Sequence, residues 1–244
     1  MTFRPTLWAT IAAAAGLAVL LGLGTWQLGR RVWKQRLLEV RTQRVEAPAI
    51  TYADIAADAD LDALEYRFIR LTGRFDGSHS LKLLNRTRDG RPGFHVITPM
   101  VTNAAGDAVL IDRGWAPVAG AAGLSPIPAG LVSIEGYVRR FETPGPFIPD
   151  NEPDTGAWFY FDRAQMAAAT GFEAVAPFYV QRAPGAAPSG DYPAGGVPNI
   201  ALRNPHLLYA ITWYALAIVL LVIYVVFHVR RRGGAGAAKN EQNR

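Results

Sequence analysis

The sequence predicts a membrane-anchored α+β protein, in which two transmembrane helices, N- and C-terminal, flank an antiparallel β-rich domain with one or two short helices. Three observations lead to this fold class. Two long stretches of the 244-residue chain carry no formal charge. The mean hydropathy of +0.09 is high for a soluble protein. Between the two stretches, short runs of aromatic and β-branched residues alternate with glycine and proline turns, which is typical of β structure.

The first uncharged stretch covers the 25 residues between Arg4 and Arg30 and consists mostly of Ala, Leu, Gly and Val. Because about 20 helical residues cross a hydrocarbon core of ~30 Å, this stretch is long enough to span a membrane. A cleaved signal peptide is the alternative, but its apolar region would be shorter and would end in a small-residue cleavage site. Here Trp26 and a pair of arginines follow the apolar run, so we expect an uncleaved signal anchor with a transmembrane helix over residues 6–29.

The second stretch covers the 26 residues between Arg203 and Arg230. It predicts a transmembrane helix over 204–229, followed by a basic cytoplasmic tail over 230–244. The two terminal segments hold six Lys and Arg residues and one Glu, whereas the segment between the spans holds 19 basic and 19 acidic residues. The net charge of +5 therefore belongs to the membrane flanks, and the domain shows no basic excess of the kind that nucleic-acid binding requires.

Two spans place both termini on one side of the membrane and the domain of residues 30–203 on the other. Lys and Arg counts alone nearly balance, with six in the tails and six in the first flank of the domain. Long domains translocate largely regardless of charge, and the triplet Arg230-Arg231-Arg232 is the densest stop signal. We expect cytoplasmic termini and a periplasmic domain, anchored in the inner (plasma) membrane of the cell.

Within the domain, the polar but helix-permissive pattern up to about Ala47 predicts that the first helix continues beyond the bilayer. Residues 51–65 predict a short helix or loop, and residues 183–200 a Pro/Gly-rich linker back to the membrane. A second helix is expected at Arg163–Thr170, with Asp162 as N-cap and Gly171 as its stop. The expected strands are Tyr66–Leu71, Ser80–Leu84, Phe94–Val101, Ala108–Asp112, Val132–Val138, Ala157–Phe161 and Phe178–Gln181.

The sequence offers no recognisable catalytic set, so we do not expect an enzyme. The chain has no cysteine, which excludes disulfides, thiolate metal sites and thiol redox pairs. Ser78 and His79 are adjacent but lack a nucleophile elbow, and we interpret them as a turn between strands. No glycine-rich loop opens a helix, and the histidines show no metal-ligand spacing: they are His79, His95, His206 and His228. We interpret His95 as a half-buried sheet residue and place His228 at the cytoplasmic interface.

The candidate site lies at the start of the second span, in the run from Arg203 to Tyr214. Asn204 is a plausible N-cap and Pro205 a favourable first helical residue, which places His206 in the first turn. Spacings of three, four and seven residues place His206, Tyr209 and Trp213 on one face of the helix. A helix N-terminus disfavours a positive charge, so His206 is expected to be the neutral imidazole that ligates metals. The alternative is an ordinary aromatic belt at the membrane surface.

The first span carries a matching patch, in which Trp26, Arg30 and Trp33 recur at helical spacing beside Gln27 and Lys34. An aromatic pocket with a neutral imidazole and arginines at the bilayer edge suits haem, with iron on His206 and propionates on the arginines. The alternative to a haem site is an ordinary aromatic belt that anchors the helix at the membrane surface, followed by a cluster of stop-transfer charges.

A stripe of small residues also lies on the first span, formed by Ala14, Ala18 and Gly22. Small side chains let two helix backbones approach closely in a membrane. We therefore expect another helix to pack on this stripe.

Over nearly its whole length, the chain resembles the Surfeit-locus protein family of cytochrome c oxidase assembly factors. The resemblance rests on six motifs in the order of that family, placed between two terminal spans. One departure is Pro205, where the family is expected to have a second asparagine, and it shifts the predicted helix start. The motifs are Gly24-Thr25-Trp26-Gln27 with Arg30 and Trp33-Lys34; Asn85-Arg86; Pro92–Val96 with Thr98-Pro99; Asp112–Pro117; Pro149–Asn151 with Glu152-Pro153 and Trp158-Phe159; and Asn204–Tyr214.

The resemblance implies a β-rich domain on the outer face of the membrane and a role in inserting haem a into the catalytic subunit of haem-copper oxidases. Carried over by position, the haem-ligating histidine of the family falls on His206. The implied partners are the catalytic subunit, the membrane and, as a further candidate, the haem a synthase, with no nucleic acid. The alternative is a membrane scaffold or receptor domain that binds assembly partners without specific haem binding. The residues leave open which oxidase is served and what Arg113-Gly114-Trp115 contacts.

Overall fold

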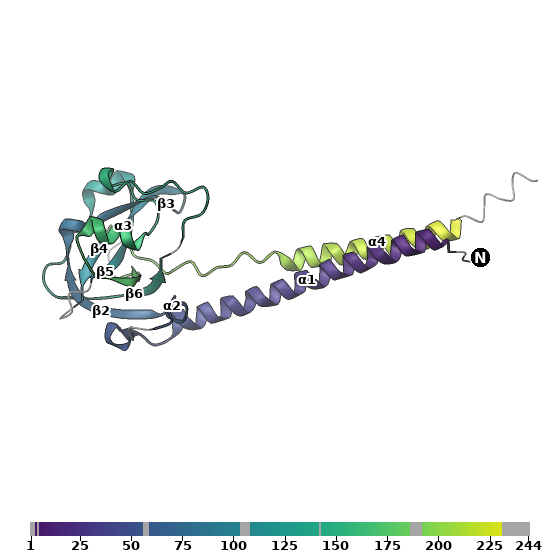
Figure 1. Ribbon diagram of the computed structural model, residues 1–244, viewed down its shortest axis with the longest axis horizontal. Helices are drawn as coiled ribbons and strands as arrows, with labels where there is room; N and C mark the ends of the chain where they lie inside the picture. Colours follow the sequence, from purple (N-terminus) through teal and green to yellow (C-terminus); the bar gives the residue numbers. More distant parts are fainter. Residues whose placement is uncertain are drawn as a thin grey trace, which may run out of the picture. The chain divides into compact units, whose positions relative to one another are not determined.

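The chain forms two compact units, which are described separately below. One unit consists of Met1–Glu39 with Ala201–Arg244, and the other is Val40–Ile200. The computed structural model (Figure 1) describes residues 3, 5–55, 59–102, 108–141, 143–185 and 192–230. Arg4, residues 103–107, part of the linker and most of the basic tail lie outside the described residues.

The first unit is built on two helices that are long and apolar enough to cross a membrane, as predicted. Helix α1 covers Leu7–Glu46 and helix α4 covers His206–Arg230. The expected continuation of the first helix beyond Arg30 is confirmed, because α1 runs unbroken through this segment.

The two helices lie antiparallel and side by side (Figure 1). Polar pairs connect them at several levels, and the partner on α4 moves toward the start of that helix as the residue on α1 moves toward its end. Thr10 Oγ1 lies 2.7 Å from Tyr224 Oη. Thr25 Oγ1 lies 3.2 Å from Tyr214 Oη. Because lipid tails offer no hydrogen bonds, such pairs help to hold two helices together in a membrane.

The packing face of α1 differs from the expected small-residue stripe. Ala14, Ala18 and Gly22 are exposed, and a Cβ added at Gly22 would have no atom within 4 Å. Instead, Gly24 is buried, and a Cβ added there would lie 2.8 Å from the ring of Tyr214. The expected stripe is not the face on which α4 packs. Small residues occur on both faces of α1, and the bulky side chains of α4 decide on which face α4 packs.

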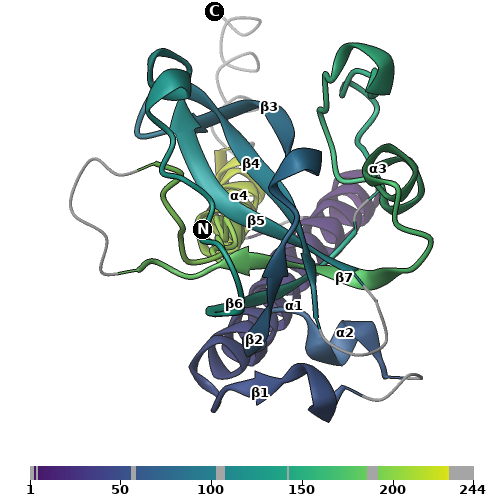
Figure 2. The same cartoon turned by 90° about the vertical axis from the view of Figure 1, so that its left-hand side faces the viewer.

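The second unit contains a seven-stranded sheet in the order β1-β2-β6-β7-β5-β4-β3 (Figures 1 and 2). A further pairing of β2 with β4, at Arg74↔Val101 and Phe75↔Met100, closes five of the strands into a small barrel. The strands are β1 (Ile50–Thr51), β2 (Phe68–Phe75), β3 (Leu81–Arg88), β4 (Arg91–Val101), β5 (Ala108–Pro117), β6 (Val132–Arg140) and β7 (Val175–Arg182).

The predicted β-rich domain is confirmed, with two differences in detail. Most pairings are antiparallel, but β1–β2 and β5–β7 are parallel. The expected strand at Ala157–Phe161 is wrong, because this segment forms only isolated bridges, from Ala157 to Glu152 and from Trp158 to Leu83. The segment is apolar because its side chains pack in the core, as the buried Trp158 does, and not because it pairs as a strand of the sheet.

Strand β5 is buried on both faces, which explains its continuous apolar pattern. Val109 and Ile111 point into the barrel core, together with Phe178 of β7. Ala108 and Leu110 point to the opposite side, where a second cluster includes Trp158 and Met166.

The short helices follow the expected capping chemistry. Helix α3 covers Arg163–Thr170 (Figure 2). Asp162 accepts a hydrogen bond from Gln165 N, and Gly171 ends the helix in the left-handed conformation, so both predicted ends are confirmed. The 51–65 segment contains a 3₁₀ turn, Tyr52–Asp54, and the one-turn helix α2, Leu61–Leu64.

Candidate functional site

His206 lies in the first turn of α4, as the sequence predicted, although the helix begins at His206 itself and not at Pro205. Its ring packs against α1, where the Nδ1–H donates to Gln27 Oε1 at 2.6 Å. The two residues are 179 positions apart in the chain, and the antiparallel helix pair brings them together.

This hydrogen bond determines the chemistry of the imidazole. A neutral imidazole carries one proton, and a proton on Nδ1 leaves Nε2 with a free electron pair. Nε2 is buried and has no hydrogen-bond partner among the described residues. A carbonyl oxygen bonded to one ring nitrogen and a free electron pair on the other nitrogen is the usual arrangement of a metal-ligating histidine. The His206 side chain therefore presents one orphaned donor atom to a ligand.

The residues around His206 attach the start of α4 to α1. Lys34 Nζ donates to the carbonyl oxygen of Arg203 at 2.8 Å. Asn204 Nδ2 donates to the carbonyl oxygen of Arg31 at 3.3 Å, while its Oδ1 is buried and has no hydrogen-bond partner in the described part of the chain. The expected N-cap role of Asn204 is therefore wrong, because its amide serves the neighbouring helix instead of the first turn of α4.

The aromatic residues of the predicted site are less enclosed than the histidine. Trp213 is half-buried. Tyr209 and Trp26 are 53% and 56% exposed, and among the described residues no ring contact or hydrogen bond joins either of them to His206. These exposed rings lie on helices that cross a membrane, where lipid or a ligand would cover them.

Two cations of α1 belong to the same end of the helix pair. The Arg30 guanidinium lies over the ring of Trp33, 4.4 Å from its centroid, so the predicted Arg30–Trp33 patch is present. The charges of Lys34 and Arg30 both act electrostatically on the His206 ring. An anionic ligand near His206 would meet these two positive charges.

Gln27 is the functional residue that sequence reasoning placed near the patch but did not include in the site. The signal was its position one residue after Trp26, on an otherwise apolar span. A lone amide in a membrane helix needs a partner, because unsatisfied polar groups are costly in lipid. The sequence alone does not show that its partner is His206.

The other histidines described are engaged elsewhere. His79 Nδ1 lies 2.7 Å from Asp76 and 3.1 Å from Ser78 Oγ in an exposed 3₁₀ turn between β2 and β3, which confirms the expected turn. One nitrogen serves both neighbours, so this is not a nucleophile–base–acid relay. His228 is buried, and both of its ring nitrogens are bonded, to Thr6 N and to the Tyr224 carbonyl.

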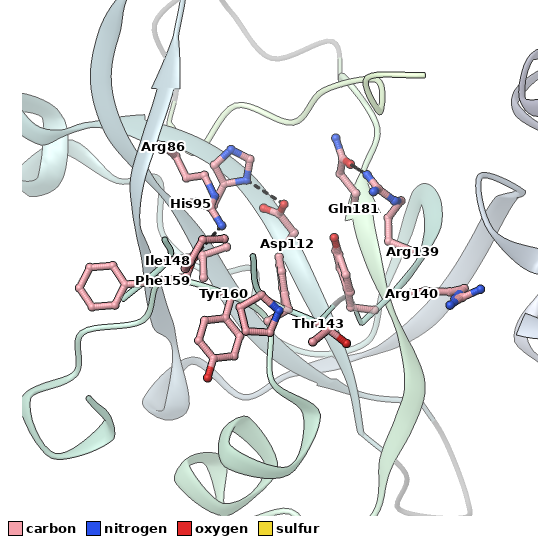
Figure 3. Close-up of a pocket in the computed structure, with 14 residues that line it drawn as sticks. Arg86, His95, Asp112, Arg139, Arg140, Thr143, Ile148, Phe159, Tyr160 and Gln181 are labelled. Atoms are coloured by element: carbon pink, nitrogen blue, oxygen red, sulfur yellow. Dashed lines mark hydrogen bonds and ion pairs between the residues drawn. The ribbon is translucent and has the colours of Figure 1, made fainter. Parts of the chain in front are cut away.

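His95 is half-buried in the sheet, as expected, and contacts the buried Asp112. The pair lies beside a cavity in the barrel domain, drawn in Figure 3. Within the described residues, no group of three or more His, Asp or Glu side chains could hold a metal ion on its own. A metal at any of these histidines would have to bring most of its ligands with it.

The SURF1 family model matches residues 14–218. Surfeit locus protein 1 of Mus musculus is 34% identical over 234 residues, which cover 88% of this chain and 74% of the relative. Surfeit locus protein 1 of Homo sapiens is 35% identical over 214 residues, covering 80% and 69%. A SURF1-like protein of Monosiga brevicollis is 32% identical over 243 residues, covering 93% and 88%.

Proposed function

Because this chain belongs to the SURF1 family, we propose that it is an assembly factor for haem-copper cytochrome c oxidase that binds haem a and supports its insertion into the catalytic subunit. The observation that carries the haem-binding part is the orphaned, buried Nε2 of His206, with Nδ1 held by Gln27. The protein acts in this proposal without catalysis of its own, as a carrier or holder of the cofactor.

The residues present fit such a group. Haem a would supply an iron atom that a neutral imidazole nitrogen can ligate, and His206 would hold it. Gln27 keeps His206 in the tautomer with a free Nε2. Arg30 and Lys34 supply positive charge for carboxylate side arms, and Trp213, Tyr209 and Trp26 supply apolar ring surface.

The proposed partners follow from the same role. The oxidase catalytic subunit would receive the cofactor, and a haem a synthase is the candidate source. We place the protein in the inner (plasma) membrane with its domain on the periplasmic side, on the basis of the arginine triplet after α4.

The test compares haem per protein and the Soret band for the full chain and two variants, purified side by side in detergent. His206→Ala should insert normally but carry a lost or shifted Soret band, because only the axial bond is removed. Trp213→Ala should lower occupancy less, since a buried aromatic contributes ~1–3 kcal/mol of contact.

His95→Ala is the matched histidine control and should keep the wild-type spectrum. Full occupancy in His206→Ala together with loss in His95→Ala would overturn the assignment of the ligand. A wild-type protein that co-purifies with the catalytic subunit but never shows haem would instead support the scaffold or receptor alternative.

A further inference from the structure

A cavity of about 240 Å³ opens on the barrel domain, and its lining includes none of the residues assigned to haem. Its wall comes from β3–β7 and from the segment 143–161 (Figure 3). The side chains that line it include Arg86, His95, Asp112, Ile148, Phe161 and Tyr179.

The acidic side chain of the wall is already satisfied. Asp112 is 3% exposed, and its Oδ2 accepts from His95 Nδ1–H at 2.7 Å. Its Oδ1 accepts from Gly114 N–H at 3.0 Å. The ladder between β4 and β5 shifts register after Val96, and this bulge brings Asp112 beside His95. With both oxygens bonded, the carboxylate is held against the sheet.

Arg86 differs from the other cations of this wall because, among the described residues, its guanidinium bonds only uncharged carbonyl oxygens. Its Nη2–H donates to the Phe159 carbonyl at 3.0 Å and its Nη1–H to the Leu84 carbonyl at 3.3 Å. No ion pair involves Arg86 within the part of the chain that the structure describes. The Arg86 side chain is half-buried, and burial lowers the pKa of its guanidinium while the charge of Asp112 acts in the opposite direction. Figure 3 shows the guanidinium beside His95, next to the cavity.

The two other guanidinium groups of the wall have acidic partners. Arg139 Nε lies 3.4 Å from Glu65 Oε1, and Arg140 pairs with Asp62. Their charges are therefore largely offset. Arg86 has free N–H donors and makes no ion pair among the described residues. The Asp112 carboxylate acts on it electrostatically, but both oxygens of that carboxylate are bonded to His95 and Gly114. Arg86 is therefore the group that an anion would approach.

The remaining wall is aromatic and apolar. Phe161 and Tyr179 stack with their ring centroids 3.8 Å apart, and Phe141 packs against Tyr179 at 5.7 Å. At the rim, Ile148 is 44% exposed. Such a wall suits a flat apolar body, while a few placed polar groups determine its orientation.

We propose that this cavity binds a small organic carboxylate with an aromatic or apolar body, with the carboxylate on Arg86 and the body against Phe161 and Tyr179. A guanidinium is suited to a carboxylate because its planar N–H fork can bond both oxygens. The Asp112–Trp115 segment positions this site: Asp112 holds His95, and Trp115 Nε1 donates to the Arg86 carbonyl at 3.2 Å.

The test titrates 4-fluorobenzoate into the full chain in detergent and follows ¹⁹F NMR line broadening. The neutral 4-fluorobenzamide, of the same shape, is the control for partition into micelles and should bind at least about tenfold more weakly. Arg86→Gln should weaken the carboxylate by a similar factor, and Arg74→Gln, an exposed arginine outside the cavity, should not.

Ile148→Glu keeps the test decisive if Arg86→Gln destabilises the domain, because this exposed rim position contributes little to folding. A carboxylate at the rim should weaken 4-fluorobenzoate several-fold, whereas Ile148→Gln should leave it near wild type. Equal binding of acid and amide, or no effect of Ile148→Glu, would overturn the proposal. His206→Ala should bind the probe normally, so this site and the haem proposal can fail separately.

Discussion

At the scale of single residues, one hydrogen bond determines the orientation and the tautomer of the His206 ring at the start of α4. Gln27 Oε1 accepts a hydrogen bond from His206 Nδ1–H, and the buried Nε2 has no partner among the residues that the structure describes. Losing such an outer partner typically lowers metal affinity by about 10–100-fold, because the ring can rotate and change tautomer.

We therefore predict that Gln27→Leu lowers haem retention by about 10–100-fold while the protein still inserts. Gln27→Glu, which keeps an acceptor in place, should restore most of it. The measurement is a haem titration followed at the Soret band, and Gln35→Leu on an exposed face of the same helix is the control. Unchanged retention in Gln27→Leu would show that the hydrogen bond does not orient the ligand.

At the scale of elements, the α1–α4 pair is held by a close approach at Gly24 and by polar pairs along the helices. Gly24 precedes Thr25, whose hydroxyl bonds Tyr214 Oη. The same tyrosine therefore packs on the backbone of α1 at Gly24 and makes a hydrogen bond to α1 one residue later. Gly22, two residues earlier, has open space beside it.

We expect Gly24→Leu to force the helices apart, since even a Cβ there would lie 2.8 Å from the Tyr214 ring. Because the chain has no cysteine, spin labels on cysteines introduced at Leu21 and Leu216 report the separation by pulsed EPR. The distance distribution should lengthen and broaden in Gly24→Leu and stay unchanged in Gly22→Leu. The same response from both variants would contradict the packing face described here.

At the scale of the whole molecule, the two membrane helices place both ends of the chain on one side. We predict that an alkaline phosphatase fusion at Gly190 is active in a bacterial host and that a fusion after Arg232 is inactive, because the proposed topology translocates the domain and retains the arginine triplet. The reverse pattern of activities would invert the topology and the proposed compartment.

The barrel unit should also fold without the helices. Its core is closed by the β2–β4 pairing, and its apolar clusters are made by its own strands and α3. We predict that a fragment of residues 40–200 unfolds cooperatively by circular dichroism but does not acquire a Soret band on haem titration. Stoichiometric haem binding by this fragment would move the ligand to His79 or His95.

The sequence by itself determined the features that depend on neighbouring residues. Hydropathy located both spans, and the alternation of β-branched runs with turns located most strands. Capping chemistry placed both ends of α3, with Asp162 and Gly171 as its signals. The first-turn position of His206 followed from local pattern as well. These properties are local because helix ends and strand propensity are determined within a few residues.

Only the tertiary structure decided which distant groups meet. The closure of the barrel and the parallel pairing of β5 with β7 join segments that are far apart in the sequence. The same is true of the packing of α4 on one face of α1, and the Asp112–His95 contact forms across a bulge. Gln27 and His206 are separated by 179 residues, and several polar groups near each could have served as partners. The choice among such partners is made by packing of the whole chain, because each contact is favourable only once the surrounding elements are in place.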